Sequence, residues 1–470
     1  MTEQSTQLVV IGGGPGGYAA AFYAADLGLN VTLVDMDKNP GGVCLYRGCI
    51  PSKAWLHVAK LLHETKQAKN WGVEFSEPKI NLDKLNGFVQ GVVTKLTGGL
   101  GQLAKARKVN FIQGCAEFMD SATLKIKSAD GKDITLKFEK AILATGSRPV
   151  KLPNFPESDR IVDSTGALQI PQIPKKFLVV GGGYIGLELG SVYAALGSEV
   201  TVVEMANGLM AGADRDLVSI LEKRLKKDFK NIHLETKVTE VKEDKIGLKV
   251  NFDGKFSGTE TFDKILVSIG RKPNSEKLGL EKTKVKINER GFIQIQPNCQ
   301  TDDPNIFAIG DVVGGAMLAH KASHEARVAV DASQGKRTAF QPLAIPAVVF
   351  TDPEIAWAGI TESEAKTQGK NVRVEKFPWG ASGRATTLDR DDGLTKIIID
   401  AESERVLGVG ITGPGAGEMI AEGTLAIEMG ATVADLALTI HAHPTLSETV
   451  METAEMFHGM CTHMFKPKRK

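Results

Sequence analysis

Two cysteines in the segment GGVCLYRGCIPSK, from Gly41 to Lys53, are close enough in sequence to do chemistry together. Such a pair indicates a metal site, a redox couple, or two unrelated buried cysteines. In a regular helix, Cys44 and Cys49 would be separated by about 7.5 Å of rise and would point to nearly opposite sides. A disulfide needs Cα atoms within about 7 Å. Pairing therefore requires a bend, which Gly48 and Pro51 permit.

A histidine near the C-terminal end is the second group that could take part in catalysis, in the segment LTIHAHPTLSE. His443 precedes Pro444, which favours an extended or turn conformation. Glu448 is near enough to accept a hydrogen bond from the imidazole if a helix begins at Thr445. A histidine oriented by a carboxylate is a general base. A lone histidine is more often structural, so this interpretation depends on the thiol pair.

The elements that position these groups begin with a glycine-rich crossover at the start of the chain. A predicted strand, Gln7 to Ile11, leads into a G-x-G-x-x-G turn and a predicted helix from Tyr18 to Leu27. A second strand, Val31 to Val34, ends in Asp35. The glycines are Gly12, Gly14 and Gly17. Strand, turn, helix and acid together are typical of a dinucleotide site, with the phosphates at the helix N-terminus and the acid on a ribose hydroxyl.

The same pattern occurs a second time in the chain. Val180 to Glu204 aligns without gaps on Ile11 to Asp35, and 10 of the 25 positions are identical. The matching glycines are Gly181, Gly183 and Gly186. Two dinucleotide sites in a redox protein most commonly hold a flavin that stays bound and a nicotinamide that exchanges.

Residues beyond the glycines assign each site. No arginine follows Glu204 to accept a 2′-phosphate, and a free carboxylate would repel one, so NAD is favoured over NADP. The segment TDDPNIFAIGD predicts a strand that ends beside Asp311, which is placed to bind the polyol of a flavin. Strand-then-glycine turns at ATGSRP, 144–149, and SIGRKPN, 268–274, are expected to close the two nucleotide domains.

The composition is that of an ordinary protein with several cores. The 470 residues are 42% hydrophobic and 24% charged, with a net charge of +1, so charge gives no support for a nucleic-acid or membrane-surface role. No window approaches 18 uncharged apolar residues, which predicts no membrane span. The polar start MTEQSTQ lacks signal-peptide features, and we expect a cytoplasmic protein whose KPKRK end is a solvated tail.

Taken together, these motifs resemble those of the pyridine nucleotide-disulfide oxidoreductases, nearly end to end. The resemblance is carried by GGVCLYRGCIPSK, GGGYIGLE, FAIGD, MLAHKA, FPWGASGRA and HAHPTLSE. MLAHKA, LTIHAHPTLSE and the absence of an arginine after Glu204 are closer to the lipoamide-oxidising branch than to glutathione reductases.

The resemblance implies an α/β fold with two Rossmann-like domains and a C-terminal α+β domain. The expected divisions are an FAD-binding domain at 1–149, an NAD-binding domain at 150–275, a central domain at 276–342 that completes the FAD site, and a dimerisation domain at 343–470. It implies FAD held by Gly12, Gly14, Gly17, Asp35, Ala116, Asp311 and Ala319. It implies NAD held by Gly181, Gly183, Gly186, Glu204, Val238 and Gly270.

The family's chemistry, carried over, makes the thiol pair a redox-active disulfide. Cys44 would form the mixed disulfide with reduced lipoamide, Cys49 would face the flavin, and His443 would take the thiol proton. Lys53 would lie near the flavin and pair with Glu188. The family's histidine comes from the partner subunit, which implies a homodimer. The implied partners are lipoyl domains of 2-oxoacid dehydrogenase assemblies, with glycine cleavage as a second candidate assembly.

Departures from the family are few, and two alternatives stay open. Tyr46 and Arg47 stand between the cysteines where relatives often carry smaller polar residues, so substrate affinity or redox poise could differ. No lipoyl-bearing segment precedes Gln7, and Cys461 stands alone near the end, which disfavours mercuric reductase and large thioredoxin reductases. The alternatives are a flavin reductase of another small disulfide and a structural subunit whose redox site is vestigial.

Overall fold

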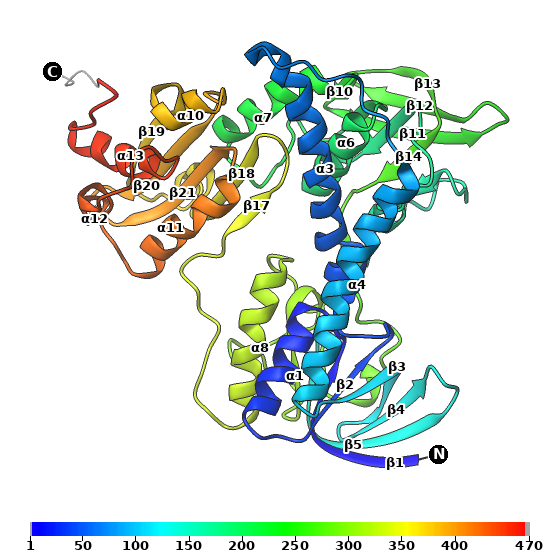
Figure 1. Cartoon of the computed structure of the whole chain (residues 1–470). Helices are drawn as coiled ribbons and strands as arrows, with labels where there is room; N and C mark the ends of the chain where they lie inside the picture. Colours follow the sequence, from blue (N-terminus) through cyan, green and yellow to red (C-terminus); the bar gives the residue numbers. More distant parts are fainter. Residues whose placement is uncertain (1, 466–470) are drawn as a thin grey trace.

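The computed structural model describes residues 2–465, so the basic run at 466–470 lies outside the described part. The chain forms three bodies around two long helices (Figure 1). The N-terminal sheet and its helices lie at the bottom of that view, the second nucleotide domain at the top right, and the C-terminal domain at the top left. This is the α/β architecture with an added α+β domain that the sequence predicts.

The first nucleotide domain is built on a six-stranded sheet in the order β1-β2-β3-β4-β5-β16, with β1 also paired to β5. Strands β2, β1, β5 and β16 run parallel, and β3 to β5 form an antiparallel meander. Helices α1 (Pro15–Asp26) and α8 (Ala319–Ser333) pack side by side over it (Figure 1). The strands are β1 (Thr2–Ile11), β2 (Val31–Asp35), β3 (Asn110–Asp120), β4 (Thr123–Ser128), β5 (Asp133–Leu143) and β16 (Ile306–Ala308).

The segment expected to complete the first nucleotide site does join this domain. Strand β16 pairs with β5, and α8 packs on α1, although more than a hundred residues separate each pair in sequence. The parallel strands are apolar on both faces, and Leu8 to Val10 are fully buried. Parallel strands covered on both faces need such runs. The arrangement supports the proposed division at 276–342.

The second nucleotide domain repeats the crossover on a five-stranded parallel sheet in the order β10-β9-β8-β14-β7. Helix α6 (Tyr184–Ala195) connects β8 (Lys176–Val180) to β9 (Glu199–Val203). A separate three-stranded antiparallel sheet, β11-β12-β13, lies next to it. The other elements are α5 (Ser164–Ala167), α7 (Arg215–Asp228), β7 (Ile161–Val162), β10 (Asn231–His233), β11 (Thr236–Glu243), β12 (Leu248–Gly254), β13 (Gly258–Phe262) and β14 (Lys264–Val267).

Two long helices and one short sheet connect the nucleotide domains. Helices α3 (Cys49–Gln67) and α4 (Leu82–Ala106) run from the first domain toward the second (Figure 1). Strands β6 (Ser147–Pro149) and β15 (Arg271–Pro273) pair antiparallel, which brings together the two glycine turns that the sequence singles out. The remaining elements here are α2 (Gly42–Arg47) and the short 3-10 turns η1 (Ala68–Trp71), η2 (Leu280–Lys282) and η3 (Gly310–Val313).

The C-terminal domain is a five-stranded antiparallel sheet with helices on one side, in the order β17-β18-β21-β20-β19. Its core joins the sheet to helices α11 and α13 through residues such as Ile411, Ile420 and Val450. The strands are β17 (Ala347–Val349), β18 (Glu354–Gly359), β19 (Val372–Pro378), β20 (Leu394–Asp400) and β21 (Val406–Gly413). The helices are α9 (Glu362–Thr367), η4 (Trp379–Ala381), α10 (Gly383–Thr387), α11 (Ala416–Glu428), α12 (Val433–Leu438) and α13 (Glu448–His458).

Helix boundaries differ from the sequence expectation by a few residues. The first helix starts at Pro15, earlier than Tyr18, because Pro is well suited to a helix's first turn and Gly14 is its N-cap. The last helix starts at Glu448 and not at Thr445, because the Glu448 carboxylate accepts the Thr445 N–H at 2.7 Å in a turn that precedes the helix.

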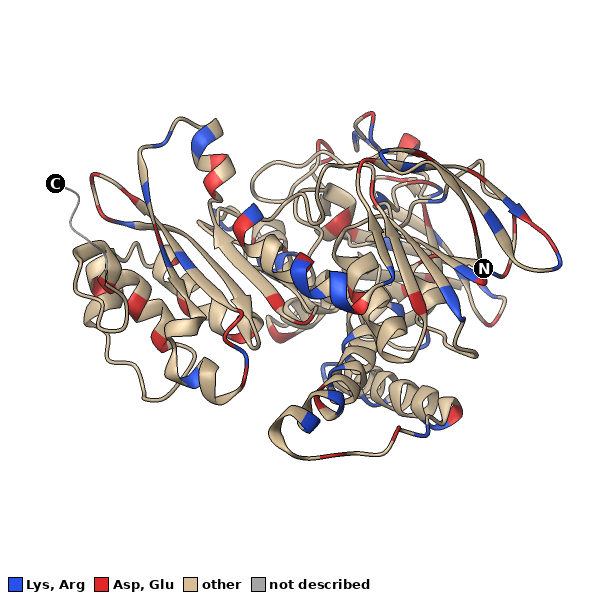
Figure 2. Ribbon diagram, turned by 90° about the horizontal axis from the view of Figure 1, so that it is seen from above, with Lys and Arg blue, Asp and Glu red and all other residues tan. Residues whose placement is uncertain are grey.

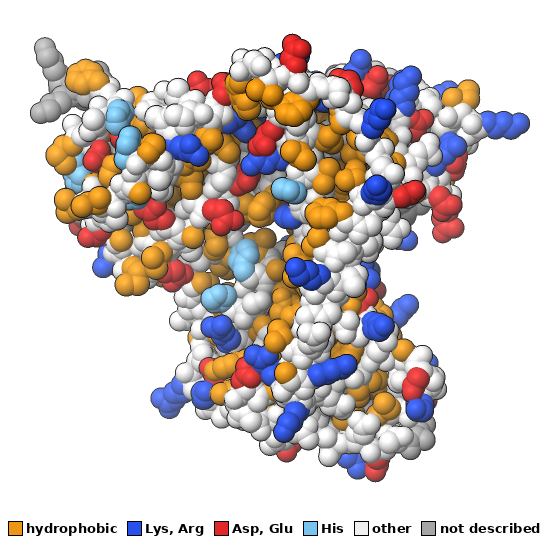
Figure 3. Space-filling model, in the orientation of Figure 1, with side chains coloured by type: hydrophobic (Ala, Val, Ile, Leu, Met, Phe, Trp, Pro, Cys, Tyr) orange, Lys and Arg blue, Asp and Glu red, His pale blue; other side chains and the backbone are white. Residues whose placement is uncertain are grey.

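Charged residues of both signs are spread over the molecule, whose net charge is +1. Basic and acidic residues are interspersed along the ribbon (Figure 2), and their side chains are mixed over the face drawn in Figure 3. Within residues 2–465, no helix is both long enough and apolar enough to cross a membrane.

Candidate functional site

The two thiols lie on either side of a break between α2 and α3. Helix α2 ends at Arg47, α3 begins at Cys49, and Gly48 between them has φ −146° and ψ −112°. A Cβ at Gly48 would lie 2.9 Å from the Val43 carbonyl oxygen. The bend required for pairing is therefore present, and it is made at the glycine. Pro51 falls in the first turn of α3, where its missing N–H breaks no helical bond.

Cys44 and Cys49 are free thiols in this structure, and their side chains hydrogen-bond to each other. This bond lowers the pKa of Cys49 to about 7, with help from the Lys53 ammonium. The same bond, together with burial, raises the pKa of Cys44. The reduced pair thus carries its negative charge on Cys49 and its proton on Cys44, and the two sulfurs have different roles available to them.

Lys53 and Glu188 form the expected ion pair between α3 and α6. The Lys53 Nζ atom lies 2.8 Å from Glu188 Oε2, and the Glu188 side chain is only 4% exposed. The other Glu188 oxygen accepts the Phe350 N–H at 2.9 Å, and Lys53 Nζ lies 4.4 Å from the centre of the Phe350 ring. The lysine is therefore fixed beside the thiol pair, and its charge is balanced by a buried carboxylate.

A central cleft runs from the first glycine turn past the thiols to α6. It is bounded by residues from seven separated stretches of chain, including most of the residues predicted for FAD and for catalysis. Those predicted residues are Gly12, Gly14, Asp35, Cys44, Cys49, Lys53, Glu188, Asp311 and Ala319.

The shape of the cleft fits a dinucleotide at its glycine end. Gly14 caps α1 without a side-chain hydrogen bond, the first turn has no acid, and the first-turn N–H groups are available to a phosphate. A Cβ on Gly14 would meet no atom within 4 Å, so the glycine leaves open space there. A Cβ on Gly12 would instead lie 2.3 Å from the Ala144 carbonyl oxygen, and one on Gly17 would lie 1.7 Å from that of Gly12.

Asp35 closes the same turn at the end of β2. Its carboxylate accepts the N–H of Gly13 and, at 2.8 Å, that of Asp37. Burial raises the pKa of Asp35 despite these bonds. A carboxylate held in this way at the cleft is a suitable acceptor for a ribose hydroxyl.

Asp311 lies at the opposite side of the cleft, within a small network. Ser147 donates its hydroxyl to Asp311, and Arg271 donates to the Ser147 hydroxyl and carbonyl oxygens at 2.7 Å each. Arg271 also lies 3.9 Å from the Asp311 carboxylate. The network joins β6, β15 and η3, so three stretches of chain fix the acid that the sequence assigns to the flavin polyol.

The second crossover presents the predicted NAD residues on the other side of α6. Gly183 caps α6 without a side chain, and a Cβ on Gly186 would lie 2.4 Å from the Gly181 carbonyl oxygen. Glu204 accepts the N–H groups of Gly182 and Ala206, each at 2.7 Å. Gly270 follows β14 with φ +128°, and Val238 lies in β11. These features fit a second dinucleotide with its ribose at Glu204.

His443 and Glu448 form the predicted pair. The imidazole Nδ1 lies 2.9 Å from Glu448 Oε1, and the His443 side chain is 73% exposed. Burial would raise the pKa of Glu448, but the bonds from Thr445 and His443 hold it below its ordinary value. Because the anionic carboxylate accepts from Nδ1, Nε2 keeps its lone pair for a proton. His443 precedes α13 and Glu448 begins it, and neither residue lines the central cleft of its own chain.

Some predicted residues lie outside the cleft. Other residues contribute to the site although the sequence did not predict them. Ala116 is buried in β3 within the core of the first domain, and its contact with FAD stays a prediction. Sequence reasoning missed Ser147, Arg271 and Phe350. The first two lie in the glycine turns that it did single out, so those turns held a signal. Phe350 has no local signal, because tertiary packing alone brings it to Glu188.

The unusual residues between the cysteines contact the loop that follows β2, and Arg47 also lines the central cleft. Arg47 pairs with Asp37, and the Tyr46 hydroxyl hydrogen-bonds to the backbone of Asn39 at 3.2 Å. Both therefore attach the α2 helix to the loop that follows β2.

Comparison with known proteins agrees with this geometry. Residues 6–326 match the family model of the pyridine nucleotide-disulphide oxidoreductases, and residues 345–454 match the dimerisation domain of the same family. The chain belongs to this family. It is an oxidoreductase whose cofactors are FAD and NAD, and the matched dimerisation domain supports a homodimer.

Similar proteins indicate which branch of the family the chain resembles. A dihydrolipoyl dehydrogenase of Haemophilus influenzae is 50% identical over 100% of this chain and 98% of that protein. One of Geobacillus stearothermophilus is 45% identical over 98% of this chain and 97% of its own. Among solved structures, LpdA of Mycobacterium tuberculosis has a TM-score of 0.90 at 27% identity, covering 97% of this chain and all of that one. The HOCl-induced flavoprotein disulfide reductase RclA of Escherichia coli, as a Cu(II) complex, has a TM-score of 0.86 at 27% identity, covering 96% of this chain and 99% of that one.

Proposed function

We propose that this enzyme oxidises dihydrolipoamide carried on the lipoyl domains of 2-oxoacid dehydrogenase assemblies, and passes the electron pair to NAD. The observation that carries the proposal is the asymmetric thiol pair at the edge of a dinucleotide-shaped cleft. The full-length likeness to dihydrolipoyl dehydrogenases at 50% identity favours this substrate over that of RclA, which is 27% identical.

The thiol pair is proposed to work as a disulfide that the substrate reduces. One lipoyl thiolate attacks Cys44, the Cys44–Cys49 bond breaks, and Cys49 leaves as a thiolate. The second lipoyl sulfur then attacks the first, which releases the Cys44 thiol and the lipoyl disulfide. Cys49 leaves beside the Lys53 ammonium, which stabilises its thiolate. FAD held at the cleft would supply the redox chemistry that links the two thiols to NAD.

His443 is proposed to act as the base, from the partner subunit. Its Nε2 accepts the proton of the lipoyl thiol, and Glu448 stabilises the imidazolium that results. The exposed position of His443, away from the cleft of its own chain, supports this arrangement. Each of two sites in a dimer would then combine Cys44 of one chain with the histidine of the other.

The cofactor residues follow from the same geometry. FAD would be held by Gly12, Gly14, Asp35, Asp311 and Ala319, and Gly17 would support its turn by close packing. NAD would be held at Gly181, Gly183, Gly186, Glu204, Val238 and Gly270. We keep the division at 149, 275 and 342 and a cytoplasmic location as parts of the proposal.

Steady-state assays test the substrate. Lipoamide with NADH should be turned over far faster than glutathione disulfide with NADPH. The reverse preference would show that the substrate is another small disulfide. A purified protein without FAD and without lipoamide turnover would favour a structural subunit.

A mixed dimer tests the shared site. Cys44→Ser and His443→Gln proteins should each be inactive with lipoamide while they retain FAD. After dissociation and reassociation as an equal mixture, activity should return to about a quarter of the wild-type value, because half the dimers are mixed and each holds one intact site. If both residues act within one chain, the mixture stays inactive.

A further inference from the structure

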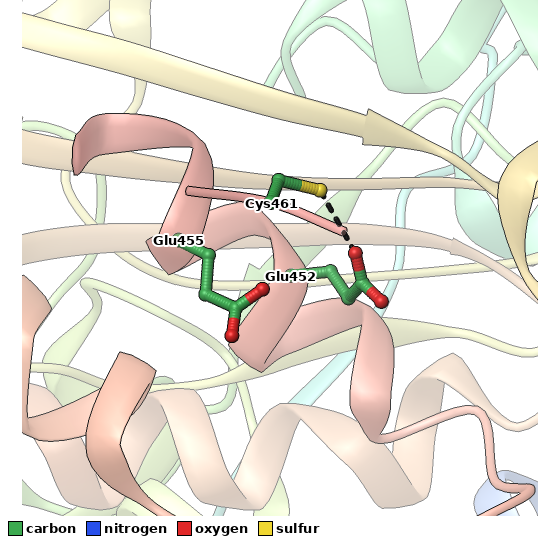
Figure 4. A group of neighbouring side chains, drawn as sticks. All are labelled: Glu452, Glu455 and Cys461. Carbon is green, nitrogen blue, oxygen red and sulfur yellow. Dashed lines mark hydrogen bonds between the residues drawn. The ribbon is translucent and has the colours of Figure 1, made fainter. Parts of the chain in front are cut away.

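A group of metal-ligating side chains lies at the end of α13, outside the site described above. Ligand atoms of Glu452, Glu455 and Cys461 all lie within 4.8 Å of one another. Figure 4 shows both carboxylates and the thiol directed toward one small space beside the helix. His463 joins them through Glu452, with which its Nδ1 forms a hydrogen bond.

The fold of the chain end brings the four residues together. Glu452 and Glu455 are three residues apart in α13, so they lie on the same face of the helix. Gly459 ends the helix with φ +70°, in the left-handed region that a glycine adopts without strain. The chain therefore turns back after the helix, which places Cys461 and His463 against its acidic face.

Three side chains of the group hydrogen-bond to one another. Glu452 Oε2 accepts the Cys461 thiol at 2.8 Å, and its other oxygen accepts from His463. Glu455 Oε2 is buried and has no hydrogen-bond partner among the described residues. An unpartnered buried carboxylate oxygen is costly, because it has lost water and gained nothing in exchange.

The charge of the group is balanced only in part, because a protonated His463 forms an ion pair with Glu452. The Glu452 side chain is only 6% exposed. Within residues 2–465, no lysine or arginine forms an ion pair with Glu452 or Glu455. A cation would stabilise all of these groups at once.

We propose that Glu452, Glu455, Cys461 and His463 bind a divalent transition-metal ion of the zinc type. One thiolate, one imidazole and two carboxylates suit Zn²⁺ in four-coordinate geometry. Sulfur and nitrogen ligands disfavour Mg²⁺ and Ca²⁺, which prefer oxygen. Binding displaces the Cys461 proton to solvent and leaves the histidine neutral, so affinity rises with pH. The His463 side chain is 56% exposed, which leaves a path for the ion.

The site would attach the chain end to the helix that orients the base. Glu448, the partner of His443, is the first residue of α13, and the four ligands gather at the other end of the same helix. The ion would hold residues 461–463 on α13 without touching the thiols of the cleft. Its proposed role is structural, and it is independent of the lipoamide chemistry.

Zinc titration of the FAD-loaded dimer tests the site. The protein would carry Cys44→Ser and Cys49→Ser, so that the cleft thiols do not bind the ion. Calorimetry with Zn²⁺ alone should give one ion per chain. Cys461→Ser and His463→Asn, both near the chain end and expected to leave the fold intact, should each weaken binding about 100-fold. Cys115→Ser, which removes an exposed cysteine on β3, is the matched control and should bind as before.

X-ray absorption gives a second measurement that does not depend on affinity. The bound zinc should show one sulfur ligand at about 2.3 Å, which Cys461→Ser removes. Absence of stoichiometric zinc in the parent protein, or equal binding by the Cys461→Ser variant, would overturn the proposal. So would tighter binding of Mg²⁺ than of Zn²⁺, since oxygen ligands alone would then account for it.

Discussion

In both glycine-rich crossovers, the residue between the first two glycines of the motif donates its N–H to the acid that ends the second strand. Gly13 donates to Asp35 in the first copy, and Gly182 donates to Glu204 in the second. Both acids also accept the N–H two residues further on, at 2.7–2.8 Å. The residue after each acid, Met36 or Met205, is exposed in both copies. The local structures are therefore nearly the same.

The surroundings of the two copies differ. Around the first, η3, β6 and the α2–α3 break converge on the cleft, and the Asp311 network closes its far side. The second copy contributes Tyr184 and Glu188 of α6 to that same cleft. Similar crossovers thus have different surroundings, and only the first has its glycine turn on this cleft lined by several segments. We propose that this difference lets one chain retain FAD and exchange NAD.

The largest effect is expected from adding a side chain beneath each glycine turn. Gly17→Val should give protein without FAD, because even its Cβ would lie 1.7 Å from the Gly12 carbonyl oxygen. Gly186→Val should keep FAD and lower NADH-dependent turnover about 100-fold, since a displaced turn misplaces the nicotinamide. Flavin absorbance per chain and steady-state rates measure the two outcomes.

If Gly17→Val and Gly186→Val both lost FAD, the two glycine turns would not serve separate nucleotide sites. The second turn would then be part of the flavin domain's stability and not a separate site. Gly212→Ala is the control, because Gly212 lies outside the crossover and no atom lies within 4 Å of the position of its Cβ.

A smaller effect is expected from the acids that end the second strands. Asp35→Asn should weaken FAD retention about 10- to 100-fold, and Glu204→Gln should raise the KM for NADH by a similar factor, since each loses a charged hydrogen bond to a ribose. Glu204→Gln should also narrow the preference for NADH over NADPH, because the repelling charge is gone. Flavin release in dilution and KM for both nucleotides are the measurements. An unchanged KM for NADH in the Glu204 variant would contradict the assignment of the second site.

Much of this comparison could be predicted from the sequence, because it rests on local patterns. The glycine spacing, the strand periodicity and the terminal acids act within about 25 residues, and both crossovers were expected where they occur. The bend at Gly48 and the pairing of His443 with Glu448 are equally local.

The rest depends on contacts between distant segments. Nothing near Phe350 indicates that its N–H would hold Glu188, 162 residues away in sequence. Arg271 and Ser147 meet only because β15 pairs with β6. The metal-ligating group was missed for a different reason. Cys461 stands alone in the sequence, and Glu452 and Glu455 lie near it only because the chain reverses at Gly459.

The smallest effect is expected at the pair that joins the two regions. Lys53 on α3 meets Glu188 on α6, and its ammonium lowers the pKa of Cys49. Removing that charge disfavours the thiolate, so Lys53→Met should raise the pKa of Cys49 by about one unit. At pH 7 the thiolate fraction of the reduced enzyme, and with it the rate of alkylation, should fall several-fold.

Iodoacetamide alkylation of the reduced enzyme, followed by peptide mass spectrometry, gives the rate at Cys49 as a function of pH. Wild-type enzyme should show its midpoint well below that of an ordinary thiol, and the variant should show it at higher pH. Lys60→Met is the control, because Lys60 lies on the same helix with an exposed partner, Glu64, at 3.9 Å. A midpoint that moves equally in both variants would mean that the general positive charge of α3 tunes the thiol. A shift confined to Lys53→Met would show that its position against Glu188 does so, and thus that the second crossover, through α6, sets the chemistry beside the first.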